Sequence, residues 1–122
     1  MPAEFALSEE ALGDGRHVVA VRGEIDLFTA PELKKTLQEA IESGATRVVV
    51  DLSETTFLDS TALGVLIGAV KRLRQRDGTL VIVNTDANIQ KTFEITGLDQ
   101  IFTILPTRDD AIAALDDAAS PS

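Results

Sequence analysis

The sequence predicts one small α/β (α+β) domain, built on a mixed β-sheet with helices covering at least one face. Three observations favour this fold class. The chain has 122 residues, a length sufficient for one hydrophobic core but too short for two domains. Strand-like and helix-like apolar patterns alternate along it. A glycine-rich turn near its start indicates an antiparallel hairpin, whereas the later helical crossovers favour parallel strands with right-handed connections.

The first two strands are expected over residues 5–12 and 17–22. Between them lie Gly13, Asp14 and Gly15, a composition that supplies the positive φ angles of a hairpin turn. We therefore expect the sheet to begin with an antiparallel pair.

The first helix is expected to begin at Thr29 and to end at Ser43-Gly44. Thr29 and Glu32 have the S/T-x-x-E spacing of a capping box, and Pro31 suits the first helical turn. Apolar residues at helical spacing give this helix an inward face, formed by Leu33, Leu37, Ala40 and Ile41.

The middle of the chain joins a buried strand to a second helix. The strand is expected over residues 47–52, because its three consecutive valines are typical of a strand covered on both faces. Residues 52–58 are expected to form a loop. A helix then runs over residues 60–76, with Asp59 or Ser60 as its N-cap. Its inward face is formed by Leu63, Leu66, Ile67, Val70 and Leu73.

The last third of the chain is expected to add two strands and two helices. These are a strand over 79–83, a helix over 87–96, a short strand over 101–105 and a helix ending at Leu115. The flanking turn and capping residues are Asp77-Gly78, Asp86, Gly97 and Thr107. We expect residues 1–117 to form the domain and residues 118–122, which are small and polar, to form a disordered tail.

The composition excludes several classes of function. The chain carries 11 basic and 20 acidic residues, a formal net charge of −9, which argues against nucleic acid or an anionic membrane surface as a partner. One basic cluster lies at the end of the second predicted helix, where cations complement the helix dipole: Lys71, Arg72, Arg74 and Arg76.

Metal and cofactor sites are not expected either. The chain has no cysteine and a single histidine, His17, so it lacks the residues for a disulfide framework, a thiolate zinc site or a histidine cluster. Its first residues do not resemble a signal peptide, and no apolar run approaches the length of about 20 residues that spans a bilayer. The sequence therefore predicts a soluble, cytoplasmic protein.

Ser60 and Thr61 place two hydroxyl groups where a strand gives way to a helix. The first-turn N–H groups of a helix lack intrahelical partners, and the helix dipole makes this end electropositive, so a phosphate would be tolerated there. The alternative is that Asp59 and Ser60 are only helix caps, a role worth about 1 kcal/mol.

A strip of mostly small residues beside the apolar face of this helix suggests a docking surface. It consists of Thr61, Gly64, Val65, Gly68 and Arg72. Both glycines weaken the helix, so some gain should offset them. The alternative is that the glycines fit the helix against its own sheet.

An enzymatic function has weaker support. Asp26 and Asp51 lie near the predicted carboxyl ends of strands, where clustered acids such as Glu24 and Asp59 could hold Mg²⁺ for phosphotransfer. The alternative for Asp26 and Asp51 is solvation and hydrogen bonding in turns. No phosphate-binding glycine motif follows a strand, and no nucleophile has a base and an orienting group. We therefore expect a protein that is not an enzyme.

Several segments in order along the chain resemble one known family. They are GEIDL at 23–27, TAPEL at 29–33, VVVDLSETTFLDSTALGVL at 48–66, and TGLD at 96–99 before Phe102. Together they closely resemble the STAS domain of bacterial anti-sigma factor antagonists, over about residues 5–115. The resemblance implies a small sheet with helices mainly on one face, and a non-enzymatic regulator that binds an anti-sigma factor and so releases a sigma factor.

The resemblance also implies the site residues. Ser60 would be the phosphate acceptor, with Asp26 and Asp59 as acidic neighbours and the helix that follows as part of the partner surface. The kinase would be the anti-sigma factor itself, and a PP2C-type phosphatase would reverse the modification. Ala62 departs from the glycine that family members often carry there, and Thr61 offers a second hydroxyl. A monomer or weak dimer is expected; a STAS module acting on another signalling enzyme or assembly is the alternative.

Overall fold

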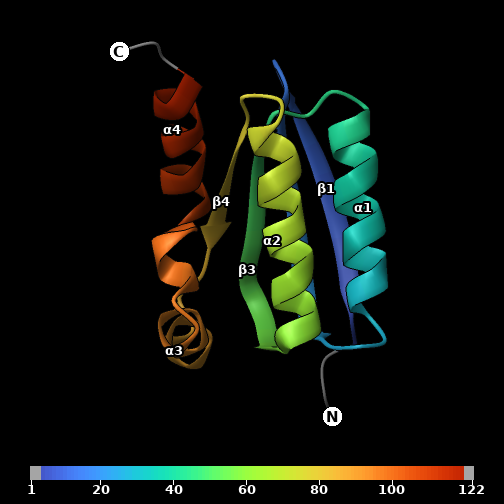
Figure 1. Ribbon diagram of the computed structural model, residues 1–122, viewed down its shortest axis with the longest axis vertical. Coiled ribbons are helices and arrows are strands. Elements are labelled where there is room, and N and C mark those ends of the chain that lie inside the picture. The colour runs from blue at the N-terminus through green and yellow to red at the C-terminus, as the bar shows by residue number, and fades with distance from the viewer. Residues whose placement is uncertain (1–3, 120–122) are drawn as a thin grey trace.

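A five-stranded mixed sheet forms the centre of the computed structural model, which describes residues 4–119 (Figure 1). Its strands lie side by side in chain order: β1 (Ala6–Gly13), β2 (Arg16–Ile25), β3 (Arg47–Leu58), β4 (Thr79–Val83) and β5 (Thr103–Leu105). β1 and β2 are antiparallel, and each later pair of neighbours is parallel. The predicted α/β class and the N-terminal hairpin are therefore confirmed.

Four α-helices in the described part of the chain cover the sheet. They are α1 (Ala30–Glu42), α2 (Ser60–Arg74), α3 (Ala87–Ile95) and α4 (Arg108–Ala119), with a short 3-10 helix, η1 (Leu98–Gln100), before β5. Because each parallel strand is added beside the previous one, right-handed crossovers place α1, α2 and α3 on the same face. α4 packs against the other face, at the left in Figure 1. Helices thus lie mainly on one face, as expected.

The valine run of β3 joins two hydrophobic cores. Val48 and Val50 belong to the core under α1, α2 and α3, whereas Val49 belongs to the core under α4. Successive side chains of a strand point to opposite faces, so a strand covered on both faces needs an uninterrupted apolar run. All three valines are fully buried, and so are Ala111 and Leu115 of α4.

The segment just before Ser60 differs from the prediction. Residues 52–58, expected as a loop, continue β3 as far as Leu58, and β2 likewise extends to Ile25. β3 carries one extra residue at two positions in its pairing with β2. Such bulges interrupt the alternation by which a strand is recognised in a sequence. Within this segment the buried Thr55 hydroxyl donates to the Val21 carbonyl oxygen at 2.9 Å, which holds the bulged strand on its neighbour.

The helices end at slightly different positions from those predicted. α2 and α3 end earlier, at Arg74 and Ile95. α4 continues past Leu115 to Ala119, so the first two residues of the expected disordered tail are helical. The remainder of that tail, residues 120–122, lies outside the described residues.

The turn that follows η1 takes the place of the first two residues of the last predicted strand. Gly97 has a φ of 76° and ends the preceding helix, in the left-handed conformation that glycine adopts without strain. The N–H of Phe102 then donates to the Leu98 carbonyl oxygen at 2.9 Å. Phe102 is buried edge-to-face against Phe93, with ring centroids 5.7 Å apart. Because of this packing, β5 begins only at Thr103.

An ion pair ties the start of α4 to the sheet. Asp51 Oδ2 accepts hydrogen bonds from Arg108 Nε at 3.1 Å and Nη2 at 2.8 Å, and Asp51 Oδ1 accepts from the Ser53 N–H at 2.9 Å. Burial alone raises the pKa of Asp51. Hydrogen bonds from Ser53 and Arg108, together with the Arg108 charge, outweigh burial and hold this pKa below its ordinary value.

We expect this ion pair to contribute stability that is lost in acid. A carboxyl group with a lowered pKa in the folded state stabilises the protein above its unfolded pKa, about 3.9, and this contribution disappears as pH falls through the folded value. The unfolding free energy of Asp51→Asn should therefore lie below that of the unmodified protein at pH 7, and the gap should shrink below pH 4. Urea unfolding of both proteins across this range measures it. A gap independent of pH would contradict the assignment.

Candidate functional site

Ser60 is the first residue of α2, and its side chain is exposed. The N-cap, which the sequence left open between two residues, is Asp59: its Oδ1 accepts from the Ala62 N–H at 3.1 Å. Ser60 Oγ has no hydrogen-bond partner within residues 4–119. The hydroxyl is thus open to a modifying enzyme. It stands at an electropositive helix end, which suits an added oxyanion.

The division of roles between Asp59 and Ser60 predicts different effects on stability. Asp59→Ala removes the cap and should lower the unfolding free energy by about 1 kcal/mol. Ser60→Ala removes an exposed hydroxyl with no partner in the described chain and should change it by less than about 0.5 kcal/mol. Urea unfolding measures both, with each variant as the control for the other. A larger loss for Ser60→Ala would mean that Ser60, not Asp59, caps α2.

Asp26 organises the turn between β2 and α1. Its Oδ1 accepts from the N–H groups of Phe28 at 2.9 Å and Thr29 at 3.0 Å. The N–H of Thr29 is the main cause that lowers the pKa of Asp26; burial acts in the opposite direction, and the N–H of Phe28 lowers the pKa further. The predicted Thr29 capping box does not form, because the Thr29 hydroxyl instead accepts from the Asp26 N–H at 2.8 Å and donates to the Glu24 carbonyl oxygen at 3.0 Å.

The sheet brings Asp26 and Asp59 to the same edge, beside Ser60. Ile25 and Leu58 are partners at the carboxyl ends of β2 and β3, so the residue after each begins a neighbouring turn. The Asp59 N–H donates to the Ile25 carbonyl oxygen at 3.1 Å and joins the two turns. The predicted grouping of two acidic residues around Ser60 therefore matches the strand register.

Asp51 does not belong to this group, so the carboxylate cluster considered as an alternative from the sequence does not form. Because β3 continues to Leu58, Asp51 lies in the middle of the strand, beside Ala20 and Val83, and is bonded to Arg108. Among the described residues, no three His, Cys, Asp or Glu side chains are grouped so that they could hold a metal ion. The metal-dependent phosphotransfer site considered from the sequence is therefore not assembled.

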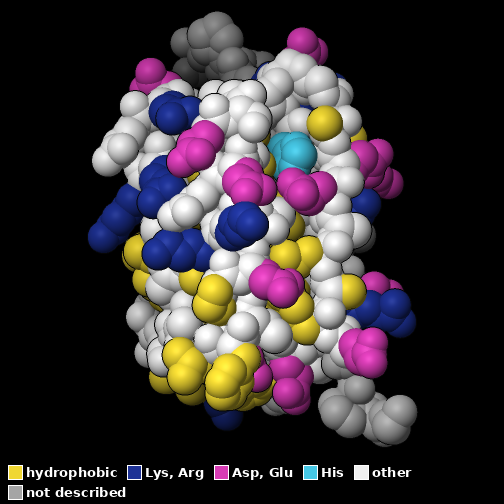
Figure 2. Space-filling view, turned by 90° about the vertical axis from the view of Figure 1, so that its right-hand side faces the viewer, with side chains coloured by type: hydrophobic (Ala, Val, Ile, Leu, Met, Phe, Trp, Pro, Cys, Tyr) yellow, Lys and Arg dark blue, Asp and Glu magenta, His cyan; other side chains and the backbone are white. Residues whose placement is uncertain are grey.

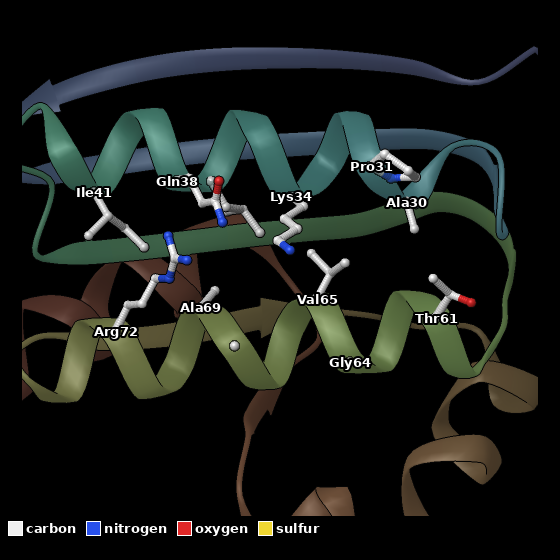
Figure 3. A pocket seen from close by; sticks show the side chains of 12 residues that line it. Ala30, Pro31, Lys34, Gln38, Ile41, Thr61, Gly64, Val65, Ala69 and Arg72 are labelled. Atoms are coloured by element: carbon white, nitrogen blue, oxygen red, sulfur yellow. The ribbon is translucent and has the colours of Figure 1, made fainter.

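The strip predicted on α2 lines a groove between α1 and α2 (Figure 3). Thr61, Gly64, Val65, Gly68 and Arg72 all border it, and its volume is about 550 Å³. A Cβ atom added at either glycine would meet nothing within 4 Å. The glycines therefore face open space, and the alternative that they fit α2 against its own sheet is wrong.

Sequence reasoning missed three exposed apolar side chains at the edge where Ser60 lies. Leu27, Phe28 and Phe57 are 64%, 86% and 49% exposed, and we call them the apolar patch. Figure 2 shows hydrophobic side chains gathered at the lower end of the molecule, where β2 turns into α1. Leu27-Phe28 in a turn between a strand and a helix was the available signal, since turns there are usually polar. Phe57 was hidden by the bulged register of β3.

The basic cluster lies at the end of α2 and just beyond it. Lys71, Arg72 and Arg74 occupy the last turn of α2, where cations complement the dipole, as the sequence predicts. Beyond the helix, Arg76 Nη1 donates to the Ile41 carbonyl oxygen at 2.7 Å, which is a structural role.

None of the helices in the described chain is long and apolar enough to cross a membrane.

Comparisons with known proteins agree on one family. The family model of the STAS domain matches residues 10–111 of this chain. The chain is 41% identical to an anti-sigma-B factor antagonist of Listeria monocytogenes over 92 residues, which cover 75% of this chain and 81% of that protein. It is 35% identical to an anti-sigma-B factor antagonist of Staphylococcus aureus over 96 residues, 79% of this chain and 89% of that protein.

A solved structure agrees as well. The crystal structure of an anti-sigma factor antagonist from Mycobacterium paratuberculosis superimposes with a TM-score of 0.84 at 33% identity. The superposition covers 93% of this chain and 96% of the other. The similarity therefore includes both the sheet and the helices on its two faces.

Proposed function

Because this chain belongs to the STAS domain family of anti-sigma factor antagonists, we propose that it is a partner switch controlled by phosphorylation of Ser60. Unphosphorylated, it binds an anti-sigma factor of the serine-kinase type, and the sigma factor is released. Phosphorylated, it dissociates, and a PP2C-type phosphatase restores the binding form. The protein itself catalyses no reaction. The observation that carries the proposal is the exposed Ser60 hydroxyl, free of partners in the described chain, at the start of α2.

The surroundings of Ser60 support a switch that leaves the fold intact. Asp59 alone provides the side-chain cap of α2, so modification of Ser60 breaks no hydrogen bond in the described chain. A phosphate adds about −1.5 to −2 charges beside Asp59 and Asp26, and in an interface it acts through repulsion and desolvation. The effect would therefore fall on the partner more than on the stability of the protein.

We assign the partner surface to the residues around Ser60 and along the groove. Asp26 and Asp59 lie beside the acceptor, and the floor of the groove provides small or short side chains that a partner can approach closely. The groove residues that we assign to the partner surface are Thr61, Gly64, Val65 and Gly68. The apolar patch extends this surface on the side of the β2–α1 turn.

Incubation with an anti-sigma factor kinase from the same genome and ATP is expected to add one phosphate, on Ser60. Intact-mass measurement and peptide mapping decide the number and the position. Ser60→Ala should remain unmodified, whereas Thr61→Ala, which keeps the acceptor and the Asp59 cap, should be modified as the unaltered protein is. Phosphate found on Thr61 or Thr56 would refute Ser60 as the acceptor. The same conclusion would follow if Ser60→Ala were modified and Thr61→Ala were not.

A further inference from the structure

The groove between α1 and α2 has the dimensions of a small-molecule site. Both helices connect parallel strands, so they run in the same direction. The lining extends from Ala30 and Thr61 at one end to Ile41 and Arg72 at the other. Eleven residues on each helix correspond to about 16 Å at the helical rise. A volume of about 550 Å³ lies within the range of roughly 300 to 1,000 Å³ typical of ligand sites.

The walls of the groove are apolar and its charged groups are basic. The apolar lining residues are Ala30, Pro31, Leu37, Ile41, Val65 and Ala69. Lys34 and Arg72 contribute two cations, and no carboxylate lines the groove, although the chain as a whole has a net charge of −9. In Figure 3 the Lys34 side chain points toward α2, over the groove. Arg72 lies at one end of the groove and Lys34 lies over its middle, so the lining complements a ligand that is apolar along its length and carries its negative charge at the Arg72 end.

Arg72 is held in place at one end of the groove. With the Gln38 amide oxygen turned toward it, this oxygen accepts from the two terminal nitrogens of Arg72 at 2.8 and 3.1 Å. Neither Arg72 nor Lys34 forms an ion pair with any other residue in the described range. A guanidinium group that is positioned by an amide and has no carboxylate partner suits the carboxylate of a ligand, which it can bind with two parallel hydrogen bonds.

We propose that this groove binds an unbranched acyl chain with a carboxylate head, such as a free fatty acid. The carboxylate contacts Arg72, and the chain lies along Val65 and Ala69 toward Ala30. The floor at Gly64 and Gly68 leaves room for it, because no neighbouring atom lies within 4 Å of the position of a Cβ at either residue. A nucleotide fits this lining poorly, since it includes no aromatic residue on which a base could stack.

A bound acyl chain would cover residues that we assign to the partner surface. Thr61, which borders the groove, directly follows Ser60. Ligand and anti-sigma factor would therefore compete for this protein, so that the switch would also respond to free acyl carboxylates. This competition rests on the proposed function, whereas binding of the ligand to the isolated chain does not.

Calorimetric titration of the full chain with dodecanoate, below its micelle concentration, tests the proposal. One saturable site is expected, and Arg72→Gln should weaken binding at least about 10-fold, as loss of a charge-assisted hydrogen bond predicts. The matched control is Arg74→Gln, an exposed residue of the same turn that does not line the groove; its affinity should be unchanged. Neutral dodecanol should bind more weakly than dodecanoate and be insensitive to Arg72→Gln.

A second variant tests the location of the acyl chain. Gly68→Leu fills the groove, and because leucine is the better helix former and has free space, the variant should fold and unfold at higher urea concentration. It should abolish dodecanoate binding. Absence of saturable binding to the unmodified chain, equal affinity of Arg72→Gln, or full affinity of folded Gly68→Leu would each overturn the proposal. If an anti-sigma factor covers the groove and dodecanoate does not compete with it, the groove is a protein-docking surface instead.

Discussion

Phosphorylation of Ser60 is expected to weaken binding to the anti-sigma factor at least about 100-fold, which corresponds to about 2.8 kcal/mol. The phosphate adds charge at the edge where Asp26 and Asp59 already lie, and an interface that covers this edge would have to desolvate all of them together. Calorimetric titration of the two forms against the partner measures the difference, with circular dichroism confirming that the fold is the same.

Substitutions at Ser60 separate the added charge from the loss of the hydroxyl. Ser60→Ala should bind the partner as tightly as the unmodified protein, whether or not ATP is present. Ser60→Asp should bind more weakly, although by less than the phosphoprotein, because it adds one charge only. Gln75→Glu is the matched control, since it introduces the same charge at the opposite, exposed end of α2. If Ser60→Asp and the phosphoprotein both bind at full affinity, Ser60 does not control the switch.

Phe28→Ala is expected to weaken partner binding by about 30-fold or more, without affecting folding. A ring that is 86% exposed contributes little to the core, so the unfolding free energy should change by less than about 0.5 kcal/mol. An aromatic side chain that anchors an interface contributes about 2 kcal/mol or more, which is about 30-fold in affinity. Calorimetric titration of the unphosphorylated variant against the anti-sigma factor measures the loss.

The conservative variant Phe28→Tyr tests whether the ring makes the contact. Both variants keep the backbone N–H that donates to Asp26, but only Phe28→Tyr keeps the ring, so it should retain most of the affinity. A Phe28→Ala variant that binds fully would exclude the apolar patch from the interface. A Phe28→Tyr variant as weak as Phe28→Ala would mean that the ring is not the group that the partner contacts.

The parts of the fold predicted from the sequence are those in which local signals and tertiary packing agree. In three places the local pattern matches the surroundings in the fold. These are the turn at residues 13–15, the valine run of β3 and the helical spacing of α2. The prediction was wrong at residues 52–58, where two bulges remove the alternation of a strand, and at the Thr29 capping box, whose spacing is present although its hydroxyl serves the Asp26 turn. The pairing of β3 with β2 decides the first case, and the hydrogen bonds of the β2–α1 turn decide the second; the spacing of residues in the sequence records neither.

The same distinction applies to the candidate site. Ser60 and the strip on α2 were predictable because a helix start and a helix face are local features. The grouping of Asp26 with Asp59 depends on the register of β2 with β3. The separation of Asp51 from them depends on how far β3 continues. The exposure of Phe28 and Phe57 follows from neither periodicity nor composition, and only the fold places them at the edge of the sheet where Ser60 lies.

The direct passage from β3 into α2 has a consequence for how a kinase would recognise this protein. Only Asp59 separates the last strand residue from Ser60, and its N–H is bonded across to β2. The Ser60 hydroxyl therefore has a position set by two strands and a helix, whereas a short excised peptide containing it would form little helix in water. A kinase that modifies Ser60 would have to read a folded surface and not a linear motif, so unfolded or partly synthesised chains would escape phosphorylation.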